Sequence, residues 1–333
     1  MSNFIVFGSL GFIGSNLSER LLEDGHNVFG VDNISTGTNE NLDMLEKHDR
    51  FNFLKLDITD KSDLDYLSRY LTANNDRIDC VFMLSGVARI QPAILNPQLT
   101  HDTNVTGMFN VLEFMRKSNI TNIVFSSSSS IYGLANKCPL KEDMPPDCLN
   151  VYSLSKYVSE QYIKTWCKLY GMNGVCLRYF NVFGQREVLA GGDFAPVVGL
   201  FFRQLLLEKK PLTIVGDGLQ RRAHTHVFDV VDANLKAAEQ CMKGIRNRFH
   251  GEVFNIGTEK NYSMIELADI ILDSLGMNRE RNKIFISQRV AELRETSADI
   301  SKAKKILGWE PKISLEEYID KHRDYYYKRW GRC

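Results

Sequence analysis

Three kinds of side chain in the middle of the sequence could together move a proton. Tyr152 and Lys156 stand four residues apart, so on a helix they would lie one turn apart on the same face. The unperturbed pKa of a tyrosine is about 10, and a nearby ammonium favours the phenolate. A serine run, Ser126–Ser130, precedes them and could relay the proton or hold a substrate oxygen. This spacing predicts an acid–base site, although ordinary amphipathic helices also carry it.

The elements that would position such a site begin at the N-terminus. The apolar run 4–7 predicts a buried parallel strand. Gly8, Gly11 and Gly14 follow it, and after a helical pattern a second apolar run stops at Asp32. Such glycines let the backbone approach a pyrophosphate at a helix N-terminus, and Asp32 could bind an adenosine ribose. Because a carboxylate would repel a 2′-phosphate, we expect NAD rather than NADP.

Composition excludes several other classes of function. Lys+Arg and Asp+Glu both total 41 among the 333 residues, so no net field draws the protein to nucleic acid or to a membrane. The seven cysteines include no C-x-x-C pair and predict reduced thiols, not disulfides or a metal site. The sequence has no apolar run of about 18 residues and no signal-peptide pattern, so we expect a cytoplasmic enzyme. The cysteine spacing leads us to expect no bound metal.

Further apolar runs alternate with helical patterns along the first half of the chain. They occupy residues 51–56, 80–84, 123–125 and 175–180, and each ends at small or polar residues. This alternation predicts an α/β fold, a doubly wound parallel sheet of the Rossmann kind whose ligands bind beyond the carboxyl ends of the strands.

In the second half of the chain, apolar runs and helical patterns no longer alternate regularly. We expect a cofactor-binding domain over residues 1–182 and a smaller, interleaved α/β substrate domain over 183–333. Part of 224–257 should return to the first domain. Further strand ends are expected at 215–218 and 254–257, and a helix at 265–275.

Several longer motifs carry a family resemblance. They are Gly8–Gly14 with Asp32-Asn33, Asp57-Ile58, Asn104–Gly107, Ser126–Ser128 with Ile131–Gly133, Tyr152 with Lys156, Leu177–Gly184, Gly216–Gly218 with Arg222, and Leu307–Pro311. Over nearly its full length the chain resembles the extended short-chain dehydrogenase/reductases, in particular NAD-dependent nucleotide-sugar epimerases of the UDP-glucose or UDP-N-acetylglucosamine 4-epimerase type.

The resemblance implies roles for individual residues. The catalytic group would be Ser128, Tyr152 and Lys156. The substrate-binding group would be Ser128, Tyr152, Asn181, Arg222, Arg289 and Thr296. The residues expected to bind NAD are Gly8, Gly11, Phe12, Ile13, Gly14, Asp32, Asn33, Asp57, Ile58, Leu84, Ser85, Gly86, Asn104, Ser126, Tyr152, Lys156 and Tyr179.

The resemblance leaves several reactions open. A UDP-glucuronate epimerase is the first alternative, followed by a 4,6-dehydratase or a decarboxylase, and more remotely an inactive NAD-binding scaffold. Dehydratases and decarboxylases of this kind carry carboxylates where this chain has Ser129 and Ser130, which favours epimerisation. Met83 and Ala88 depart from the 4-epimerase pattern, while the stretch 195–199 lacks a phosphate-binding asparagine, as N-acetylhexosamine epimerases also do.

Three further expectations concern the size of the sugar pocket, the oligomeric state and the roles of single residues. In the family, the position of Thr296 lines the end of the hexose pocket, so a small residue there predicts that N-acetylated sugars are accepted. A homodimer is expected through the helix of Tyr152 and another near residues 105–118. Tyr179 could equally be core, and His224 and His226 indicate a strand face more than a metal site.

Overall fold

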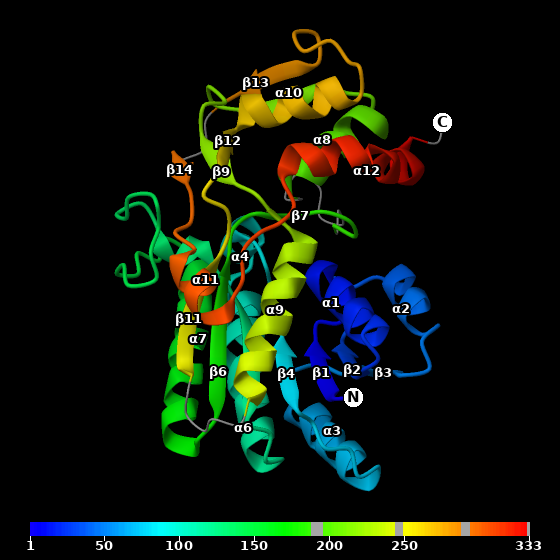
Figure 1. Ribbon diagram of the computed structural model, residues 1–333, viewed down its shortest axis with the longest axis vertical. Helices are drawn as coiled ribbons and strands as arrows, with labels where there is room; N and C mark the ends of the chain where they lie inside the picture. The colour runs from blue at the N-terminus through cyan, green and yellow to red at the C-terminus, as the bar shows by residue number, and fades with distance from the viewer. Residues whose placement is uncertain (188–195, 244–248, 288–293, 332–333) are drawn as a thin grey trace.

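The computed structural model describes residues 1–187, 196–243, 249–287 and 294–331 of the chain. A larger lobe is built on one central sheet, and a smaller lobe stands at the end of that sheet where its strands point (Figure 1). This arrangement confirms the predicted α/β class with a doubly wound parallel sheet.

The central sheet has seven parallel strands in the order β11-β6-β5-β4-β1-β2-β3. Strand order reverses between β1 and β4, and in such sheets ligands bind beyond the strand ends at this reversal. Its strands are β1 (Asn3–Phe7), β2 (Asn27–Asp32), β3 (Phe51–Lys55), β4 (Cys80–Met83), β5 (Asn122–Ser128), β6 (Asn173–Tyr179) and β11 (His250–Ile256).

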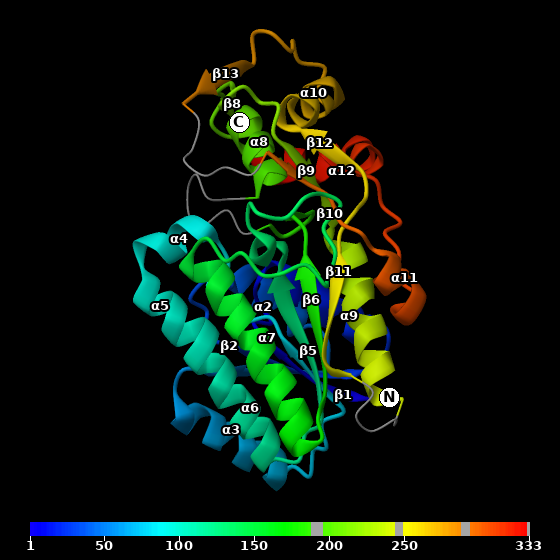
Figure 2. The same ribbon diagram turned by 90° about the vertical axis from the view of Figure 1, so that its left-hand side faces the viewer.

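Helices cover both faces of this sheet (Figure 2). On one face lie α1 and α9, with α2 beside α1, and on the other lie α3, α6 and α7. A separate hydrophobic cluster fills each side, so both faces of the strands are buried. The bounds are α1 (Phe12–Glu23), α2 (Asn39–Leu45), α3 (Lys61–Ala73), α6 (Gly107–Lys117), α7 (Val151–Tyr170) and α9 (Val227–Met242).

Short elements at the carboxyl edge of the sheet connect these layers. The helices α4 and α5 lead into a π-helical turn before α6, and the 3₁₀ turn η2 directly follows β5. Two short strands, β7 and β10, pair with each other in parallel. The bounds are α4 (Ile90–Leu95), α5 (Pro97–His101), η1 (Asp102–Thr106), η2 (Ser129–Tyr132), β7 (Val182–Phe183) and β10 (Thr225–His226).

The smaller lobe has its own apolar core, in which the rings of Phe202 and Tyr326 stack with centroids 4.0 Å apart. Its elements are α8 (Val197–Leu206), β8 (Leu212–Val215), β9 (Arg221–Ala223), β12 (Asn261–Ser263), α10 (Met264–Ser274), β13 (Lys283–Ile286), β14 (Glu295–Thr296) and α12 (Leu315–Trp330). The predicted helix at 265–275 is α10, and the predicted strand end at 215–218 follows β8. The other predicted strand end, at 254–257, belongs to β11 of the central sheet.

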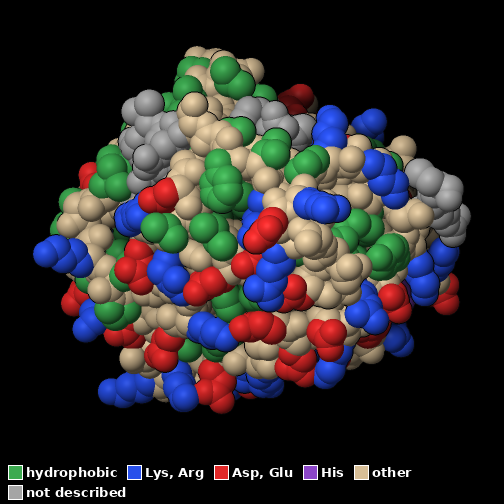
Figure 3. Space-filling model, turned by 90° about the horizontal axis from the view of Figure 1, so that it is seen from above, with side chains coloured by type: hydrophobic (Ala, Val, Ile, Leu, Met, Phe, Trp, Pro, Cys, Tyr) green, Lys and Arg blue, Asp and Glu red, His purple; other side chains and the backbone are tan. Residues whose placement is uncertain are grey.

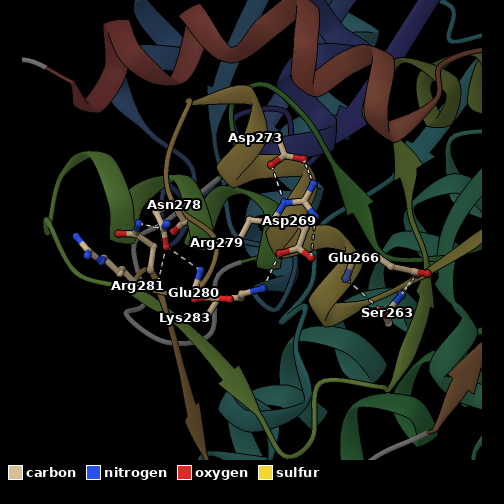
Figure 4. Close-up of polar contacts among 10 residues, drawn as sticks. Ser263, Glu266, Asp269, Asp273, Asn278, Arg279, Glu280, Arg281 and Lys283 are labelled. Atoms are coloured by element: carbon tan, nitrogen blue, oxygen red, sulfur yellow. Dashed lines mark hydrogen bonds and ion pairs between the residues drawn. The ribbon is translucent and has the colours of Figure 1, made fainter.

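Ion pairs hold the surface of the smaller lobe where α10 turns toward β13. Arg279 pairs with Asp273 and Asp269, and Lys283 also pairs with Asp269 at 2.6 Å (Figure 4). At the start of α10, Ser263 and Glu266 form a capping box, which satisfies two of the free N–H groups at a helix N-terminus. Polar contacts therefore fix both ends of this helix.

The chain passes between the two lobes more than once. After β9 it returns to the sheet as α9 and β11, and after β14 it returns again as α11 (Ser301–Leu307). The indole N–H of Trp309 then donates to the backbone oxygen of Asp229 at 2.8 Å, and the Asp229 carboxylate accepts the N–H groups of Lys312 and Ile313. These contacts fix the start of α9 against the last crossing of the chain.

The surface agrees with the balanced composition. Basic and acidic side chains are interspersed over the face of the molecule seen in Figure 3. Within the described ranges, none of the helices has both the length and the apolar character needed to cross a membrane.

Candidate active site

The first glycine turn connects β1 to α1. Gly8 has φ +81°, a conformation that side chains rarely adopt, and its N–H donates to the Val31 oxygen at 2.8 Å. A Cβ on Gly14 would lie 1.9 Å from the Gly8 oxygen, so only glycine allows this approach. Gly11 caps α1 without a side-chain hydrogen bond, which leaves the N–H groups of the first turn, at Phe12 and Ile13, for a ligand.

Asp32 ends β2 beside this turn. Its carboxylate accepts hydrogen bonds from the N–H groups of Leu10 at 3.0 Å and Ile34 at 2.8 Å. Burial raises the pKa of Asp32, and these two hydrogen bonds oppose that effect. The carboxylate therefore organises the glycine turn.

Asn33 and Asp57 meet next to Asp32. The Asn33 amide donates to the Asp57 carboxylate at 2.9 Å, and Thr59 donates to the same carboxylate through both its N–H and its hydroxyl. Ile58 differs from the polar pair, because its side chain is buried against Gly107 of α6. Only the backbone of Ile58 is left for the proposed cofactor contact.

The loop after β4 lies against the glycine turn. Leu84 donates to the Phe7 oxygen at 3.0 Å, and a Cβ on Gly8 would lie 2.8 Å from the nitrogen of Ser85. The Asn104 amide accepts the Val87 N–H at 2.8 Å and donates to the Val87 oxygen and to Ser155. Asn104 therefore fixes the loop that contains Gly86, and both of its donors are used within the protein.

The serine run does not form a single loop. Ser126–Ser128 complete β5, whereas Ser129 and Ser130 begin η2. The Ser128 hydroxyl accepts hydrogen bonds from the N–H of Ser130 at 3.2 Å and from its hydroxyl at 3.0 Å. Ser128 therefore lies at the carboxyl end of a central strand, where the strand order places a ligand.

Tyr152 and Lys156 lie on the first turns of α7, as predicted. Asn150 and Ser153 form a capping box at its start. Lys156 is buried, and its ammonium donates to the Ser126 oxygen at 2.8 Å and lies 4.8 Å from the ring centre of Phe125. The capping box thus orders the start of α7 around Tyr152, and Lys156 attaches the helix to β5.

The electrostatics differ from the sequence expectation. We expected Lys156 to lower the pKa of Tyr152, but burial raises the pKa of this phenol, although a hydrogen bond from Ser128 and the charge of Arg89 lower it. Burial also lowers the pKa of Lys156 to about 8, against the opposing charge of Glu160. The ammonium bonds the Ser126 carbonyl, so Ser128 and Arg89 are the groups that favour the phenolate here.

A buried ion pair supports the serine strand, and the sequence analysis missed it. Arg178 donates to both oxygens of Glu160, at 2.9 and 2.7 Å, and Ser127 donates to Glu160 at 2.5 Å. The guanidinium also lies 4.7 Å from the ring centre of Tyr132. A charged residue inside the apolar run 175–180 was the signal that could have revealed this pair, because buried charges are normally paired.

The predicted substrate residues lie along β9. Asn181 follows β6 and donates to the Ala223 oxygen at 2.8 Å. Arg222 lies opposite Thr296 of β14 in a parallel pairing and opposite Tyr262 of β12 in an antiparallel one. Because Ser128 pairs with Tyr179 just before Asn181, these residues form a continuous path from the catalytic strand to the smaller lobe.

Arg289, and Ala195 at the start of the stretch 195–199, lie outside the described ranges. Three other residues have structural roles. Tyr179 exchanges hydrogen bonds with Asn234 of α9 at 2.8 and 3.0 Å, which is a core arrangement. Burial lowers the pKa of His224 and His226 to about 3, so both are neutral at pH 7, and no metal-ligand cluster occurs among the described residues.

The residues present fit a dinucleotide. The glycine turn gives backbone access to a pyrophosphate, Asp32 stands beside it for a ribose, and the loop at Gly86 separates both from Lys156. A Cβ at Gly86 would lie 2.8 Å from the Asn104 side chain and 3.6 Å from the Lys156 ammonium. The glycine turn, Asp32 and the loop at Gly86 therefore lie in sequence between the start of α1 and Lys156.

Comparisons with known proteins agree with this geometry. Residues 4–257 match the NAD dependent epimerase/dehydratase family. A putative UDP-glucose 4-epimerase of Methanocaldococcus jannaschii is 37% identical over 316 residues, 95% of each chain.

Two solved structures are similar over nearly all of both chains. One is a UDP-glucose 4-epimerase of Thermotoga maritima with UDP-glucose (TM-score 0.87, 32% identity, 98% and 99% coverage). The other is a UDP-N-acetylglucosamine 4-epimerase of Methanobrevibacter ruminantium in complex with UDP-N-acetylmuramic acid (TM-score 0.87, 29% identity, 98% and 99% coverage). With the match over residues 4–257, the chain belongs to the NAD-dependent epimerase/dehydratase family, as a nucleotide-sugar 4-epimerase of the extended short-chain dehydrogenase/reductase type.

Proposed function

We propose that the protein interconverts the 4-epimers of a UDP-hexose, with UDP-GlcNAc and UDP-GalNAc among its substrates. The observation that carries the proposal is the path from Ser128 and Tyr152 along β9 to Thr296. It would place the sugar ring at the catalytic residues and the diphosphate beside Arg222.

In this proposal Tyr152 accepts the proton of the sugar 4-hydroxyl, and Ser128 holds the same oxygen by a hydrogen bond. Bound NAD, held by the glycine turn and Asp32, would supply the hydride acceptor and, once reduced, the hydride donor to the other face of the 4-keto sugar. Lys156, fixed by the Ser126 carbonyl, keeps a positive charge near the reacting atoms. The binding roles predicted from the sequence for the glycine turn, Asp32, Asn33 and Asp57 are part of the same proposal.

The catalytic turn favours epimerisation over elimination. An elimination across C5 and C6 needs a further acid and base beside the catalytic serine. Ser129 and Ser130 occupy the next two positions, and Ser130 hydrogen-bonds to Ser128. Hydroxyl groups do not supply the carboxylates that a 4,6-dehydratase or a decarboxylase would use there.

The sugar end of the site supports acceptance of the N-acetyl group. Thr296 is buried, and its hydroxyl has no hydrogen-bond partner in the protein. In the family a bulky tyrosine at this position excludes the acetamido group. Threonine is smaller by most of a ring, so an acetamido group could fit here without driving side chains off their rotamers. UDP-glucose and UDP-galactose would also fit, because a larger pocket does not reject a smaller sugar.

A homodimer through α6 and α7 is part of the proposal, with a narrower interface than the sequence suggested. Leu112 and Met115 are fully buried in the core of one subunit and cannot contact a second. Phe109 is only partly buried and packs edge-on against Trp166 of α7, with ring centres 5.6 Å apart. Sedimentation at micromolar concentration should show a dimer, and a monomer alone would remove this part of the proposal.

The decisive experiment is turnover of a nucleotide-sugar panel without added reductant. UDP-GlcNAc, UDP-GalNAc, UDP-glucose, UDP-galactose and UDP-glucuronate are incubated separately, and the products are separated by chromatography. We expect a 4-epimer pair to interconvert, including the N-acetyl pair. A 4-keto-6-deoxy product would favour the dehydratase, turnover of UDP-glucuronate alone would favour the uronate epimerase, and no turnover would favour the inactive scaffold.

A further inference from the structure

The strand that carries Thr296 is held by a loop that precedes the catalytic helix. Leu140 donates its N–H to the Ser297 oxygen at 2.9 Å, and Asp299 donates its N–H to the Leu140 oxygen at 2.9 Å. Leu140 and Ala298 form a parallel bridge between these hydrogen bonds. The smaller lobe is therefore attached, beside Thr296, to the segment between η2 and α7.

Asn255, at the end of β11, fixes this attachment to the catalytic turn. It is fully buried, and its amide donates to the oxygens of Leu140 at 2.9 Å and Asp299 at 3.3 Å. The amide oxygen accepts the hydroxyl of Tyr132 at 2.6 Å. Because Tyr132 ends the η2 turn that begins just after Ser128, one side chain links the end of the catalytic strand to Leu140 and to Asp299, three residues after Thr296.

Cys138 holds the same strand from the other side of Thr296. Its thiol accepts the N–H of Ser297 at 3.3 Å and points to the oxygen of Glu295 at 3.5 Å. These are the two residues that flank Thr296, so one sulfur contacts the backbone on both sides of it. We call Asn255, Cys138 and Leu140 together the β14 clasp.

The β14 clasp has a consequence for the size of the pocket. The backbone on both sides of Thr296 is bonded to a loop that is itself bonded to the catalytic turn, and β9 pairs with Thr296 through Arg222. Movement of Thr296 away from a larger sugar would break these hydrogen bonds and the pairing of β14 with β9, so they oppose that movement. The room for a sugar then depends on the clasp, which sets the distance between Ser128 and Thr296, as well as on the size of the Thr296 side chain.

We propose that Asn255 and Cys138 are positioning residues that determine which hexoses the enzyme accepts, by holding Thr296 at a set distance from Ser128. This inference rests on the proposed role of Thr296 at the end of the hexose pocket. Neither residue touches the sugar in this proposal. Loosening the clasp would let β14 move and would change discrimination between N-acetylated and plain hexoses more than it changes the chemical step.

Cys138→Val tests the thiol half, because valine has no hydrogen-bonding side-chain atom. Cys138→Ser is the rescue variant, since a hydroxyl can replace both contacts, and Cys148→Val is the matched control, because it changes the other described half-buried cysteine. Asn255→Leu tests the amide half. If Asn255→Leu does not fold, Cys138→Val decides the outcome alone.

Two measurements are made on each variant. The first is the ratio of kcat/KM for UDP-GlcNAc to that for UDP-glucose, which we expect Cys138→Val to change by about fivefold or more, in the range that pocket contacts discriminate. The second is hydrogen exchange of the peptide containing residues 294–299, which should become faster in Cys138→Val and stay at the wild-type rate in Cys138→Ser and Cys148→Val.

The two measurements separate the failure of this inference from failure of the proposed function. Faster exchange with a changed ratio supports the inference. Unchanged exchange, or faster exchange with an unchanged ratio, overturns it while the epimerase activity stands. If the wild-type protein converts neither sugar, the proposed function fails and this specificity role fails with it, and the exchange rates then report only whether the clasp holds β14.

Discussion

The cofactor half and the substrate half of the candidate site are built by different physical means. At the glycine turn, the decisive groups are backbone atoms, since Gly8 and Gly14 approach each other to a distance that no side chain allows. Along β9 and β14, the decisive contacts are side-chain hydrogen bonds between segments far apart in the sequence, such as Asn181 with Ala223. The first half therefore depends on a few consecutive residues, and the second on the correct packing of two lobes.

Loss of the proton acceptor should have the largest effect. Tyr152→Phe should lower kcat by a factor on the order of 10² or more, because the proposed acceptor of the sugar hydroxyl proton is lost. Bound NAD, measured by absorbance after denaturation, should stay at the wild-type level. Tyr157→Phe, a half-buried tyrosine of the same helix, is the control. Near-normal turnover in Tyr152→Phe would remove this residue from the mechanism.

The next largest effect is expected in the substrate half. Thr296→Tyr should lower kcat/KM for the N-acetyl sugars by about 20-fold more than for the plain hexoses, since a ring would fill the space of the acetamido group. Thr296→Val keeps the shape and should not change this preference. Equal losses for both kinds of sugar would show that another residue sets the size of the pocket.

Asp32→Ala tests the cofactor half. We expect NAD affinity to fall by about tenfold and the preference against NADP to weaken, because a hydrogen-bonding anion is lost. The carboxylate also accepts the N–H groups of Leu10 and Ile34, so thermal stability should fall as well. Asp24→Ala, on the surface of α1, is the control for charge. Isothermal titration with both dinucleotides measures the result, and unchanged affinities would contradict the ribose contact.

The smallest effect should come from Arg89, which precedes α4 and interacts electrostatically with Tyr152. The positive charge of Arg89 lowers the pKa of Tyr152, so its removal raises that pKa, and the acid limb of the pH–kcat profile should move to higher pH. For Arg89→Gln we expect a shift of about half a pH unit, which corresponds to a loss of about threefold below the midpoint. Arg20→Gln, paired with Asp24 on the surface, should leave the profile unchanged.

Most of the fold could be predicted because its signals are local. The strands that end at Asp32 and Ser128 are apolar runs with polar ends, and Tyr152 and Lys156 needed only helical spacing. The clasp at Asn255 could not be predicted, because it joins residues more than a hundred positions apart. The pKa of Tyr152 was also misjudged, since a spacing of four residues does not show that the lysine ammonium bonds the Ser126 carbonyl.

The docking of Trp309 on Asp229 has a consequence for how this protein could be divided or extended. The last segment that crosses between the lobes is hydrogen-bonded to the start of α9. The edge strand of the sheet, β11, follows the strands β8 and β9 of the smaller lobe in the sequence. A fragment that stopped at residue 182 would lack the edge strand beside β6 and expose its apolar flank. The smaller lobe could therefore not be exchanged for that of a relative by replacing one continuous segment. Changing the substrate specificity in this way would require replacing at least two segments, one before α9 and one after β11.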